Sequence, residues 1–288
     1  MKGIILSGGL GTRLYPLTLN MSKQLLPVYD KPMIFYPVTT LMKLGINDLL
    51  IITSQEHLKL YKKLFFDFSS LGLKIKFLVQ DRPNGIAECF LIAKNYIKGD
   101  NVALILGDNF FYGYNFENYS IPKNKNFGAQ IFAYEVENPN RYGVIEFNKK
   151  NRILKIVEKP KETNSSHVVT GLYFYDQNII KIASSIKPSK RGELEISDVN
   201  NMYLKKNKLK AIKLSYGSVW LDTGTFDSLI QTSLFVQTIQ KRQKQIIGSP
   251  HITAYQNKWI SKSQLEKIIN KLPKSPYTDQ IKDYLDRN

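Results

Sequence analysis

The chain has 288 residues, 43% of them hydrophobic, and carries a formal net charge of +17. This hydrophobic content supports a sizeable core and excludes a disordered chain. The single cysteine, Cys89, excludes an intramolecular disulfide and a cysteine-cluster metal site, and it fits a reducing cytoplasm. No apolar stretch has the length of a signal-peptide core or a membrane span, so we expect a soluble cytoplasmic protein without a membrane partner.

A strong positive charge is common in nucleic-acid-binding proteins, so its distribution matters. The lysines are scattered, and the densest clusters, 205–208 and 241–244, fall in a predicted turn and at the end of a predicted helix. Solvated surfaces explain such clusters. The sequence contains no recognisable nucleic-acid-binding module, and we therefore expect no nucleic-acid partner.

The first half of the chain alternates β-branched apolar runs with helical patterns, which is typical of strand–helix–strand units on a parallel sheet. We expect strands at 3–7, 49–53, 75–79 and 102–106, and helices at 32–43, 55–65 and 86–96. The strands are apolar enough to be buried on both faces. Because ligands bind at the carboxyl ends of parallel strands, the segments that follow the first, third and fourth strands should share one rim.

The second half is richer in strands and predicts an antiparallel or mixed extension of the sheet. We expect strands at 129–136, 143–148, 153–158 and 168–175, helices at 195–203 and 226–240, and a turn at 220–224. Two short amphipathic helices at 262–271 and 279–285 follow. We therefore divide the chain into a main domain, 1–245, and a small C-terminal helical extension, 246–288.

A glycine-rich loop follows the first strand. Gly8, Gly9 and Gly11 lack a Cβ, so the backbone N–H groups of this loop can approach an anion closely. Arg13 adds a permanently charged planar group that suits phosphoryl oxygens. The spacing matches neither the P-loop nor the dinucleotide-binding motif, and by itself such a loop is also compatible with a plain turn.

Two aspartates are candidate metal ligands. Asp108 follows the strand at 102–106, and Asp222 lies in the predicted turn. Carboxylates at a strand end opposite a phosphate loop can hold Mg²⁺ against phosphate oxygens. The alternatives are an Asx turn for Asp108 and a helix N-cap for Asp222.

Three cations could bind phosphate as well. Lys23 follows the glycine loop closely in the chain, Lys159 ends a predicted strand beside Glu158, and Arg191 precedes a predicted helix. Each is also compatible with ordinary surface charge. Nucleophilic catalysis has little support, because the sequence has no G-x-S-x-G elbow and its histidines lack metal-ligand spacing.

Longer blocks of the sequence resemble one enzyme family. Residues 6–18, LSGGLGTRLYPLT, and 22–28, SKQLLPV, are similar in identity and spacing to the sugar-1-phosphate nucleotidylyltransferases. Further blocks point, within that family, to the branch that uses dTTP and glucose 1-phosphate, and they lie at 29–34, 106–109, 141–144, 158–160, 169–176, 191–200 and 220–225. The resemblance spans essentially the whole chain.

This resemblance implies a Rossmann-like, three-layer α/β/α core with a mixed central sheet. It also implies a Mg²⁺-dependent reaction in which dTTP and α-D-glucose 1-phosphate give dTDP-glucose and diphosphate, the first step of dTDP-L-rhamnose biosynthesis. The sugar phosphate would attack the α-phosphorus directly and in line, with positioning and charge neutralisation supplying most of the catalysis.

The family also implies roles for individual residues. The catalytic residues would be Arg13 and Lys23, and the metal ligands Asp108 and Asp222. The nucleotide would contact Gly8, Gly9, Gly11, Thr12, Arg13, Gln24, Gln80, Pro83, Gly85 and Asp108. The sugar phosphate would contact Asn109, Gly143, Glu158, Lys159, Val169 and Arg191.

The resemblance further implies a homotetramer and a second nucleotide site for a dTDP-sugar feedback effector, formed in part by residues 254–260. The chain departs from the family pattern at Ser7, where alanine is usual, and at Gln256, where we expect arginine. The first change is small. The second removes a charge that would bind phosphate at the regulatory site.

Two alternative functions stay open at this point. One is the same chemistry with UTP or another hexose phosphate, since thymine and uracil differ by one methyl group. The other is a non-catalytic nucleotide-binding regulatory protein. The presence of Arg13, Lys23, Asp108 and Asp222 favours an enzyme.

Overall fold

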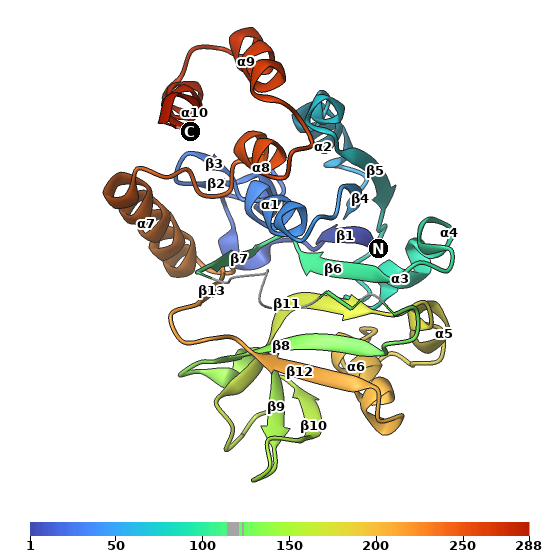
Figure 1. Ribbon diagram of the computed structural model, residues 1–288. Helices are drawn as coiled ribbons and strands as arrows, with labels where there is room; N and C mark the ends of the chain where they lie inside the picture. The colour runs from blue at the N-terminus through green and yellow to red at the C-terminus, as the bar shows by residue number, and fades with distance from the viewer. Residues whose placement is uncertain (114–120, 123, 288) are drawn as a thin grey trace.

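The first four predicted strands form the parallel part of one large mixed sheet in the computed structural model, which describes residues 1–113, 121–122 and 124–287 (Figure 1). They are β1 (Lys2–Ser7), β4 (Asp48–Thr53), β5 (Lys74–Val79) and β6 (Val102–Leu106). β1 pairs in parallel with β4 on one side and with β6 on the other, and β5 extends the sheet beyond β4. The carboxyl ends of these strands therefore share one edge, as predicted.

Burial differs among these strands. β1, β4 and β6 are almost wholly buried, whereas Lys74 and Lys76 of β5 are exposed. The prediction of burial on both faces is therefore wrong for β5. Strand β5 lies at the end of the sheet, where charged residues protect the unpaired edge from aggregation.

Helices cover both faces of the sheet, which confirms the predicted three-layer architecture. Ile5 and Val38 belong to the core on one face, and Ile4 and Phe90 belong to the core on the other. Neighbouring residues of β1 thus enter different cores, as the two-residue period of a strand requires. The first-half helices are α1 (Phe35–Lys43), α2 (Leu58–Leu64), α3 (Glu88–Ile92) and α4 (Lys94–Ile97), with short 3₁₀ turns η1 (Thr12–Leu14), η2 (Lys23–Leu25) and η3 (Phe68–Leu71).

The second half extends the sheet with mostly antiparallel strands. They are β8 (Ala129–Glu135), β9 (Gly143–Phe147), β10 (Ile153–Glu158), β11 (His167–Tyr175) and β12 (Leu209–Lys213). β11 joins the two halves, because it pairs antiparallel with β6 and also with β8 and β9. Helices α5 (Ile179–Ala183) and α6 (Ile196–Lys205) pack beside this part, and the sequence did not predict α5 or β12.

Two small ribbons complete the strands. One pairs β2 (Pro27–Val28) with β3 (Lys31–Pro32), and the other pairs β7 (Asn109–Tyr112) with β13 (Val219–Asp222). The prediction of a turn at 220–224 is therefore wrong for residues 220–222, which form a strand. Their partner strand lies about a hundred residues away in the chain, so no local pattern predicts the pairing.

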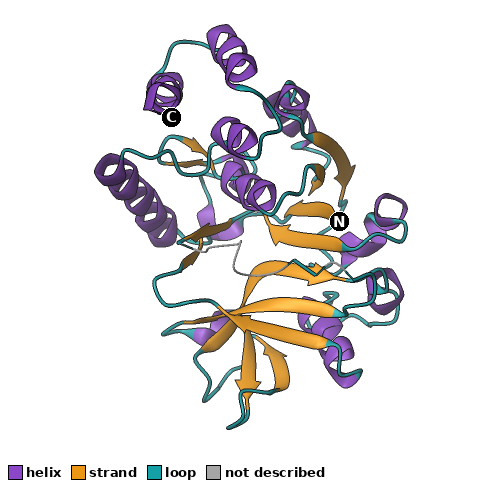
Figure 2. Cartoon of the chain, viewed as in Figure 1, coloured by secondary structure: helices purple, strands orange, loops and turns teal. Residues whose placement is uncertain are grey.

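The last four helices end the chain, with α9 and α10 at one end of the molecule near the C-terminus (Figure 2). They are α7 (Phe226–Gln243), α8 (Pro250–Gln256), α9 (Lys262–Lys271) and α10 (Pro276–Arg287). Ile252, Leu265 and Ile281 share a core with Val38 of α1. The helices α8 to α10 are thus packed onto the helical layer over one face of the sheet, while the boundary at 245/246 stays a prediction.

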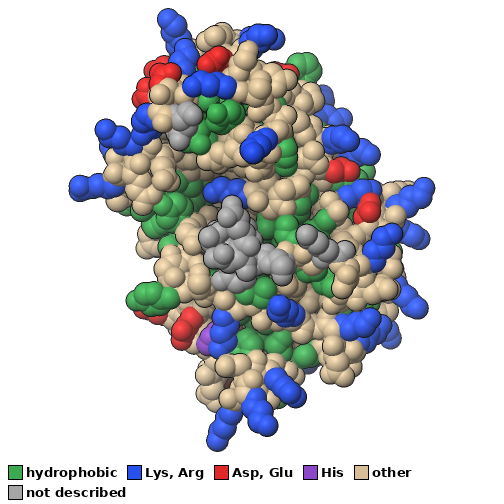
Figure 3. All heavy atoms as spheres, in the orientation of Figure 1, with side chains coloured by type: hydrophobic (Ala, Val, Ile, Leu, Met, Phe, Trp, Pro, Cys, Tyr) green, Lys and Arg blue, Asp and Glu red, His purple; other side chains and the backbone are tan. Residues whose placement is uncertain are grey.

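The surface carries its positive charge in a dispersed form. Figure 3 shows lysine and arginine side chains spread over the visible face, and not gathered into one stripe. Among the described residues, no helix is both long and apolar enough to cross a membrane.

We expect the stability of the protein to depend on pH through His251 of α8. Burial lowers the pKa of this side chain to about 4, with Asp67 opposing the shift, and its Nδ1 lies 2.9 Å from the Tyr277 hydroxyl. In the unfolded chain His251 becomes protonated near pH 6.5, whereas in the folded chain it becomes protonated only near pH 4. The protein should therefore lose up to about 3 kcal/mol of unfolding free energy as the pH falls through this window.

Urea denaturation of the unaltered protein and of His251→Gln across this pH range measures the effect. The variant should lack this part of the pH dependence, and identical pH profiles for the two proteins would contradict the assignment.

Candidate active site

The β7–β13 ribbon brings the two predicted metal ligands together. β6 ends at Leu106, Asp108 follows, and β7 begins at Asn109, which lies opposite Asp222 in the ribbon. The backbone N–H of Thr223 donates to the carbonyl oxygen of Asp108 at 3.1 Å. Two carboxylates from distant parts of the chain thus flank one short ribbon at the carboxyl end of the parallel sheet.

Both carboxylates line a cavity of about 210 Å³ between the parallel and antiparallel parts of the sheet. This volume is below the roughly 300–1,000 Å³ of pockets that bind drug-sized ligands, so it suits one small polar molecule or part of a larger one. The predicted residues that line it are Arg13, Asp108, Asn109, Gly143, Glu158, Lys159, Val169 and Asp222. The cavity is also lined by Arg141, Tyr142, Ser197 and Trp220, for which the sequence predicted no role although each lies in a block that carries the family resemblance.

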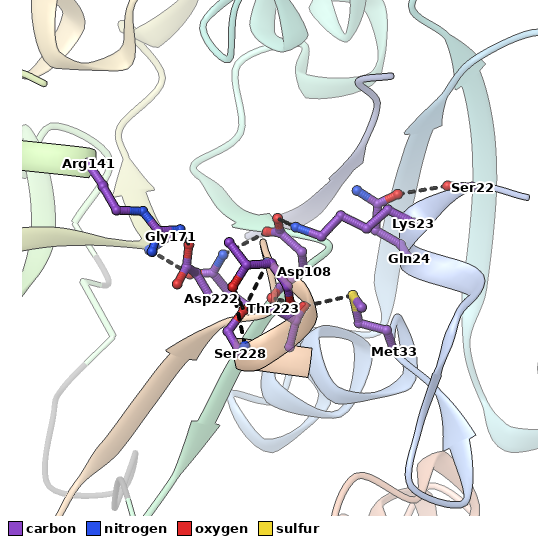
Figure 4. A network of polar contacts seen from close by, with 12 residues as sticks. Ser22, Lys23, Gln24, Met33, Asp108, Arg141, Gly171, Asp222, Thr223 and Ser228 are labelled. Atoms are coloured by element: carbon purple, nitrogen blue, oxygen red, sulfur yellow. Dashed lines mark hydrogen bonds and ion pairs between the residues drawn. The ribbon is translucent and has the colours of Figure 1, made fainter. Parts of the chain in front are cut away.

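Lys23 forms an ion pair with Asp108. The 3₁₀ turn η2 carries Lys23, and its Nζ lies 2.5 Å from Asp108 Oδ2 (Figure 4). Burial alone would raise the pKa of Asp108, but the charge of Lys23 and hydrogen bonds from Lys23 and Asn109 outweigh it and hold this pKa below its ordinary value. Asp108 is therefore a carboxylate at neutral pH.

Asp222 has different neighbours. Its Oδ1 accepts a hydrogen bond from the Tyr142 hydroxyl at 2.8 Å. Its Oδ2 lies 3.6 Å from an Arg141 guanidinium nitrogen (Figure 4). Burial and the nearby charge of Asp108 raise the pKa of Asp222, while the hydrogen bond from Tyr142 opposes that rise. A divalent cation between these carboxylates would further relieve their mutual repulsion.

The donor set fits a divalent cation of the magnesium type. The described residues contain no cluster of three or more histidine, cysteine, aspartate or glutamate side chains that could hold a metal alone. Mg²⁺ does not require one, because it is usually bound through one or two carboxylates together with substrate phosphates. Asp108 and Asp222 offer such a pair at the wall of one cavity.

Asn109 is held from three sides. Its Oδ1 accepts from the Trp220 indole N–H at 2.6 Å and from the Gly171 backbone N–H at 3.0 Å, and its Nδ2 donates to Asp108 Oδ1 at 2.8 Å. The amide is only 3% exposed. Asn109 therefore contacts the predicted metal ligand directly, in addition to lining the cavity in which we expected it to meet a sugar.

Glu158 and its neighbours form the opposite wall. Ser197 Oγ donates to Glu158 Oε2 at 2.5 Å, and a Cβ on Gly143 would lie 3.0 Å from Ser197 Oγ, so the serine side chain would have to shift by a few tenths of an ångström. Lys159 Nζ lies 3.9 Å and an Arg191 nitrogen 4.0 Å from Glu158 Oε1. Arg191 does not line the cavity but reaches its rim through Glu158, so this wall combines one carboxylate with two cations.

The glycine loop lies next to this cavity and does not line it. Gly9 has a φ of +96° and open space beside it, and Gly11 has a φ of +60° where a Cβ would lie 2.8 Å from Thr18. Thr12 begins η1, so the loop ends on Arg13, which does line the cavity. A Cβ on Gly224 would lie within 3.4 Å of both the Asp222 carboxylate and the Arg13 guanidinium. Arg13 thus connects the loop to the carboxylates.

The predicted base-binding segment lies beside the same loop. A Cβ on Gly8 would lie 2.6 Å from Gln80 Oε1, and Gln80 Nε2 donates to Glu88 at 2.7 Å and to the Gly85 carbonyl at 3.3 Å. Pro83 is exposed. Gln24 is buried and accepts a hydrogen bond from Ser22 at 2.7 Å (Figure 4). The structure therefore places Gln80, with Gly85 bonded to it, beside the glycine loop, and none of these predicted residues lines the cavity.

The chain is similar to known proteins over nearly its whole length. Residues 2–239 match the family described as nucleotidyl transferase. A glucose-1-phosphate thymidylyltransferase of Neisseria meningitidis is 49% identical over 96% of this chain and 96% of its own. One from Mycobacterium tuberculosis is 46% identical over 100% of both chains.

Solved structures share the fold of this chain. A Bacillus anthracis protein assigned as a glucose-1-phosphate thymidylyltransferase, in complex with a sucrose, is 38% identical with a TM-score of 0.74, covering 82% of this chain and 94% of its own. A UDP-glucose pyrophosphorylase in complex with UDP-glucose shares the fold, with a TM-score of 0.69, 24% identity and coverage of 85% and 99%.

We expect Gly171→Ala to destabilise the protein through Asn109. A Cβ at position 171 would lie 2.4 Å from Asn109 Oδ1, so the buried amide must move and its hydrogen bonds must lengthen. Such overpacking costs about 1–3 kcal/mol of unfolding free energy, which urea denaturation measures.

The matched control is Thr170→Val in the same strand. Its buried hydroxyl finds no hydrogen-bond partner among the described residues, so its removal at constant shape should cost little. Equal stability of Gly171→Ala and the unaltered protein would contradict the close packing at Asn109.

Proposed function

The chain belongs to the nucleotidyl transferase family, and we propose that it transfers a thymidylyl group from dTTP to α-D-glucose 1-phosphate, giving dTDP-glucose and diphosphate. The single observation that carries the proposal is the cavity in which Arg13, Asp108 and Asp222 face Glu158 and Lys159. The names of the similar proteins support the choice of thymidylyl and glucosyl groups.

The sugar phosphate occupies the cavity in this proposal. Lys159, which lines the cavity, and Arg191, which lies beside it near Glu158, bind its phosphate. Arg191 also pairs with Glu193 at 2.7 Å, a contact that the phosphate would share. Glu158 accepts hydrogen bonds from sugar hydroxyls, and Asn109, Gly143 and Val169 line the space for the ring. A pocket that pairs its polar groups with hydroxyls rejects ligands that lack them.

The nucleotide lies along the glycine loop. The backbone at Gly8, Gly9, Gly11 and Thr12 binds the triphosphate, and Gln24 borders it. Gln80, Pro83 and Gly85 meet the thymine, for which an amide side chain can both donate and accept hydrogen bonds. Arg13 and Lys23 act as catalytic residues, because both approach the carboxylates where the two substrates would meet.

Asp108 and Asp222 hold Mg²⁺ in this proposal. The ion, when bound, neutralises charge and polarises phosphoryl oxygens. The protein's own residues bring the sugar phosphate oxygen in line with the α-phosphorus and screen the repulsion between two polyanions. Lys23 and Arg13 do so without proton transfer, and Arg13 stabilises the departing diphosphate.

The wider setting follows from the same proposal. The reaction is the first step of dTDP-L-rhamnose biosynthesis and takes place in the cytoplasm, which suits a chain whose one cysteine is free and buried. Residues 246–288 form an extension that contributes to a homotetramer and to a dTDP-sugar effector site. Gln256, which hydrogen-bonds Tyr284 at 3.1 Å, provides no charge for an effector's phosphate.

Purified protein with Mg²⁺, dTTP and glucose 1-phosphate should release diphosphate, and Asp222→Asn should lower turnover by at least ~100-fold because a metal ligand supplies several kcal/mol. The matched control is Asp227→Asn, an exposed aspartate at the start of α7.

UTP should be used less well than dTTP, by the ~1–3 kcal/mol that one methyl group contributes. No diphosphate above background with any nucleotide would refute the proposal.

Lys159→Ala should raise the KM for glucose 1-phosphate roughly 10-fold or more and leave the KM for dTTP nearly unchanged, because one charge-assisted contact contributes about 1.5–3 kcal/mol. Steady-state kinetics with each substrate varied in turn measures this. Lys155→Ala is the control, since Lys155 lies on β10, the strand that Lys159 directly follows, and pairs with Glu146 at 3.0 Å outside the cavity. An equal rise for both substrates would argue against the assignment.

A further inference from the structure

We propose that Trp220 is a positioning residue whose indole N–H fixes the Asn109 amide, so that Asn109 holds the Asp108 carboxylate in place for the divalent cation. This inference rests on the proposed function, because it assigns the support of the same metal site. It adds a residue that does not itself ligate the metal.

The hydrogen-bond chemistry forces the orientation of the Asn109 amide. The two groups beside its Oδ1, the Trp220 indole N–H at 2.6 Å and the Gly171 backbone N–H at 3.0 Å, can only donate. The group beside its Nδ2 is the carboxylate of Asp108 at 2.8 Å, which accepts. A flipped amide would set donor against donor and oxygen against carboxylate. The NH₂ group must therefore face Asp108.

This orientation restrains both oxygens of Asp108. Asn109 donates to Oδ1, and Lys23 donates to Oδ2 at 2.5 Å. The carboxylate plane is thus set by two donors from different elements, β7 and η2. Loss of the indole N–H would leave the Asn109 oxygen with the Gly171 donor alone, and the amide could rotate away from Asp108.

Trp220 also supports the second carboxylate. Its ring packs edge-on against Tyr142 with centroids 5.2 Å apart, and the Tyr142 hydroxyl donates to Asp222 Oδ1 at 2.8 Å. Trp220 and Asp222 are two residues apart in β13, so their side chains share one face of the ribbon. The Trp220 side chain therefore contacts one hydrogen-bond donor of each carboxylate, Asn109 for Asp108 and Tyr142 for Asp222.

Burial strengthens the hydrogen bond between Trp220 and Asn109. Trp220 is 5% exposed and Asn109 is 3% exposed, so water competes little for their hydrogen bond. Residues that orient metal ligands commonly change metal affinity or activity by 10–100-fold when altered.

The test is Trp220→Phe, which keeps an aromatic ring and removes only the N–H donor. Mn²⁺ titration of the full chain with dTTP present and no sugar phosphate, followed by water-proton relaxation, should show affinity reduced by about 10–100-fold. The kcat should fall similarly while the KM for dTTP changes little. The matched control is Tyr134→Phe, whose ring also packs on Trp220 at 5.8 Å, and it should keep wild-type Mn²⁺ affinity.

A second measurement uses the unaltered protein and does not depend on the variant's folding. The chain has two tryptophans, Trp220 and Trp259, so its indole N–H spectrum contains two signals. The Trp220 signal should exchange with solvent more slowly than that of Trp259, and it should broaden first when Mn²⁺ is added.

The outcomes separate this inference from the proposed function. Unchanged Mn²⁺ affinity in Trp220→Phe, or rapid exchange of the Trp220 indole proton, would overturn the positioning role and leave the metal site intact. Failure of the unaltered protein to bind Mn²⁺ would overturn the metal assignment itself, and this inference with it.

Discussion

The antiparallel pairing of β7 with β13 is the constraint on which the site depends. Its register sets Asn109 opposite Asp222, although the two strands come from distant parts of the chain. A slip of one residue would turn Asp222 and Trp220 to the other face of the ribbon, because side chains alternate along a strand. The carboxylate pair and its supporting residues therefore exist only in this register.

Charge compensation explains how two carboxylates coexist at one cavity wall. Lys23 reaches Asp108 from η2, and Arg141 at the end of η5 (Pro139–Arg141) approaches Asp222. Removing a carboxylate from water without a partner is costly, so each has its own cation. Further cations, such as Lys159, lie at the opposite wall beside Glu158. This division places positive charge on both sides of the space in which two phosphorylated molecules would meet.

Much of the fold could be predicted from local patterns. The strands β1, β4, β5 and β6 begin within one residue of their predicted starts because each is a short apolar run bounded by polar or turn-forming residues. The ribbon strand β13 could not be predicted, since Trp220 and Asp222 look locally like a turn before α7. The exposed face of β5 had a local signal, because Lys74 and Lys76 alternate with Ile75 and Phe77, whereas only the strand order shows that β5 is an edge strand.

The sequence by itself determined the residue types of the site. The glycine loop, Asp108, Glu158 and Asp222 lie in the sequence blocks that resemble the family, and their side chains suit phosphate, metal and hydroxyl binding. Only the tertiary structure decided which of them meet. Arg13 and the two aspartates reach one cavity, whereas Gln80 stays beside the glycine loop. The physical reason is that hydrogen bonds and ion pairs such as Trp220 to Asn109 join residues from distant segments, and no local pattern encodes their distance or direction.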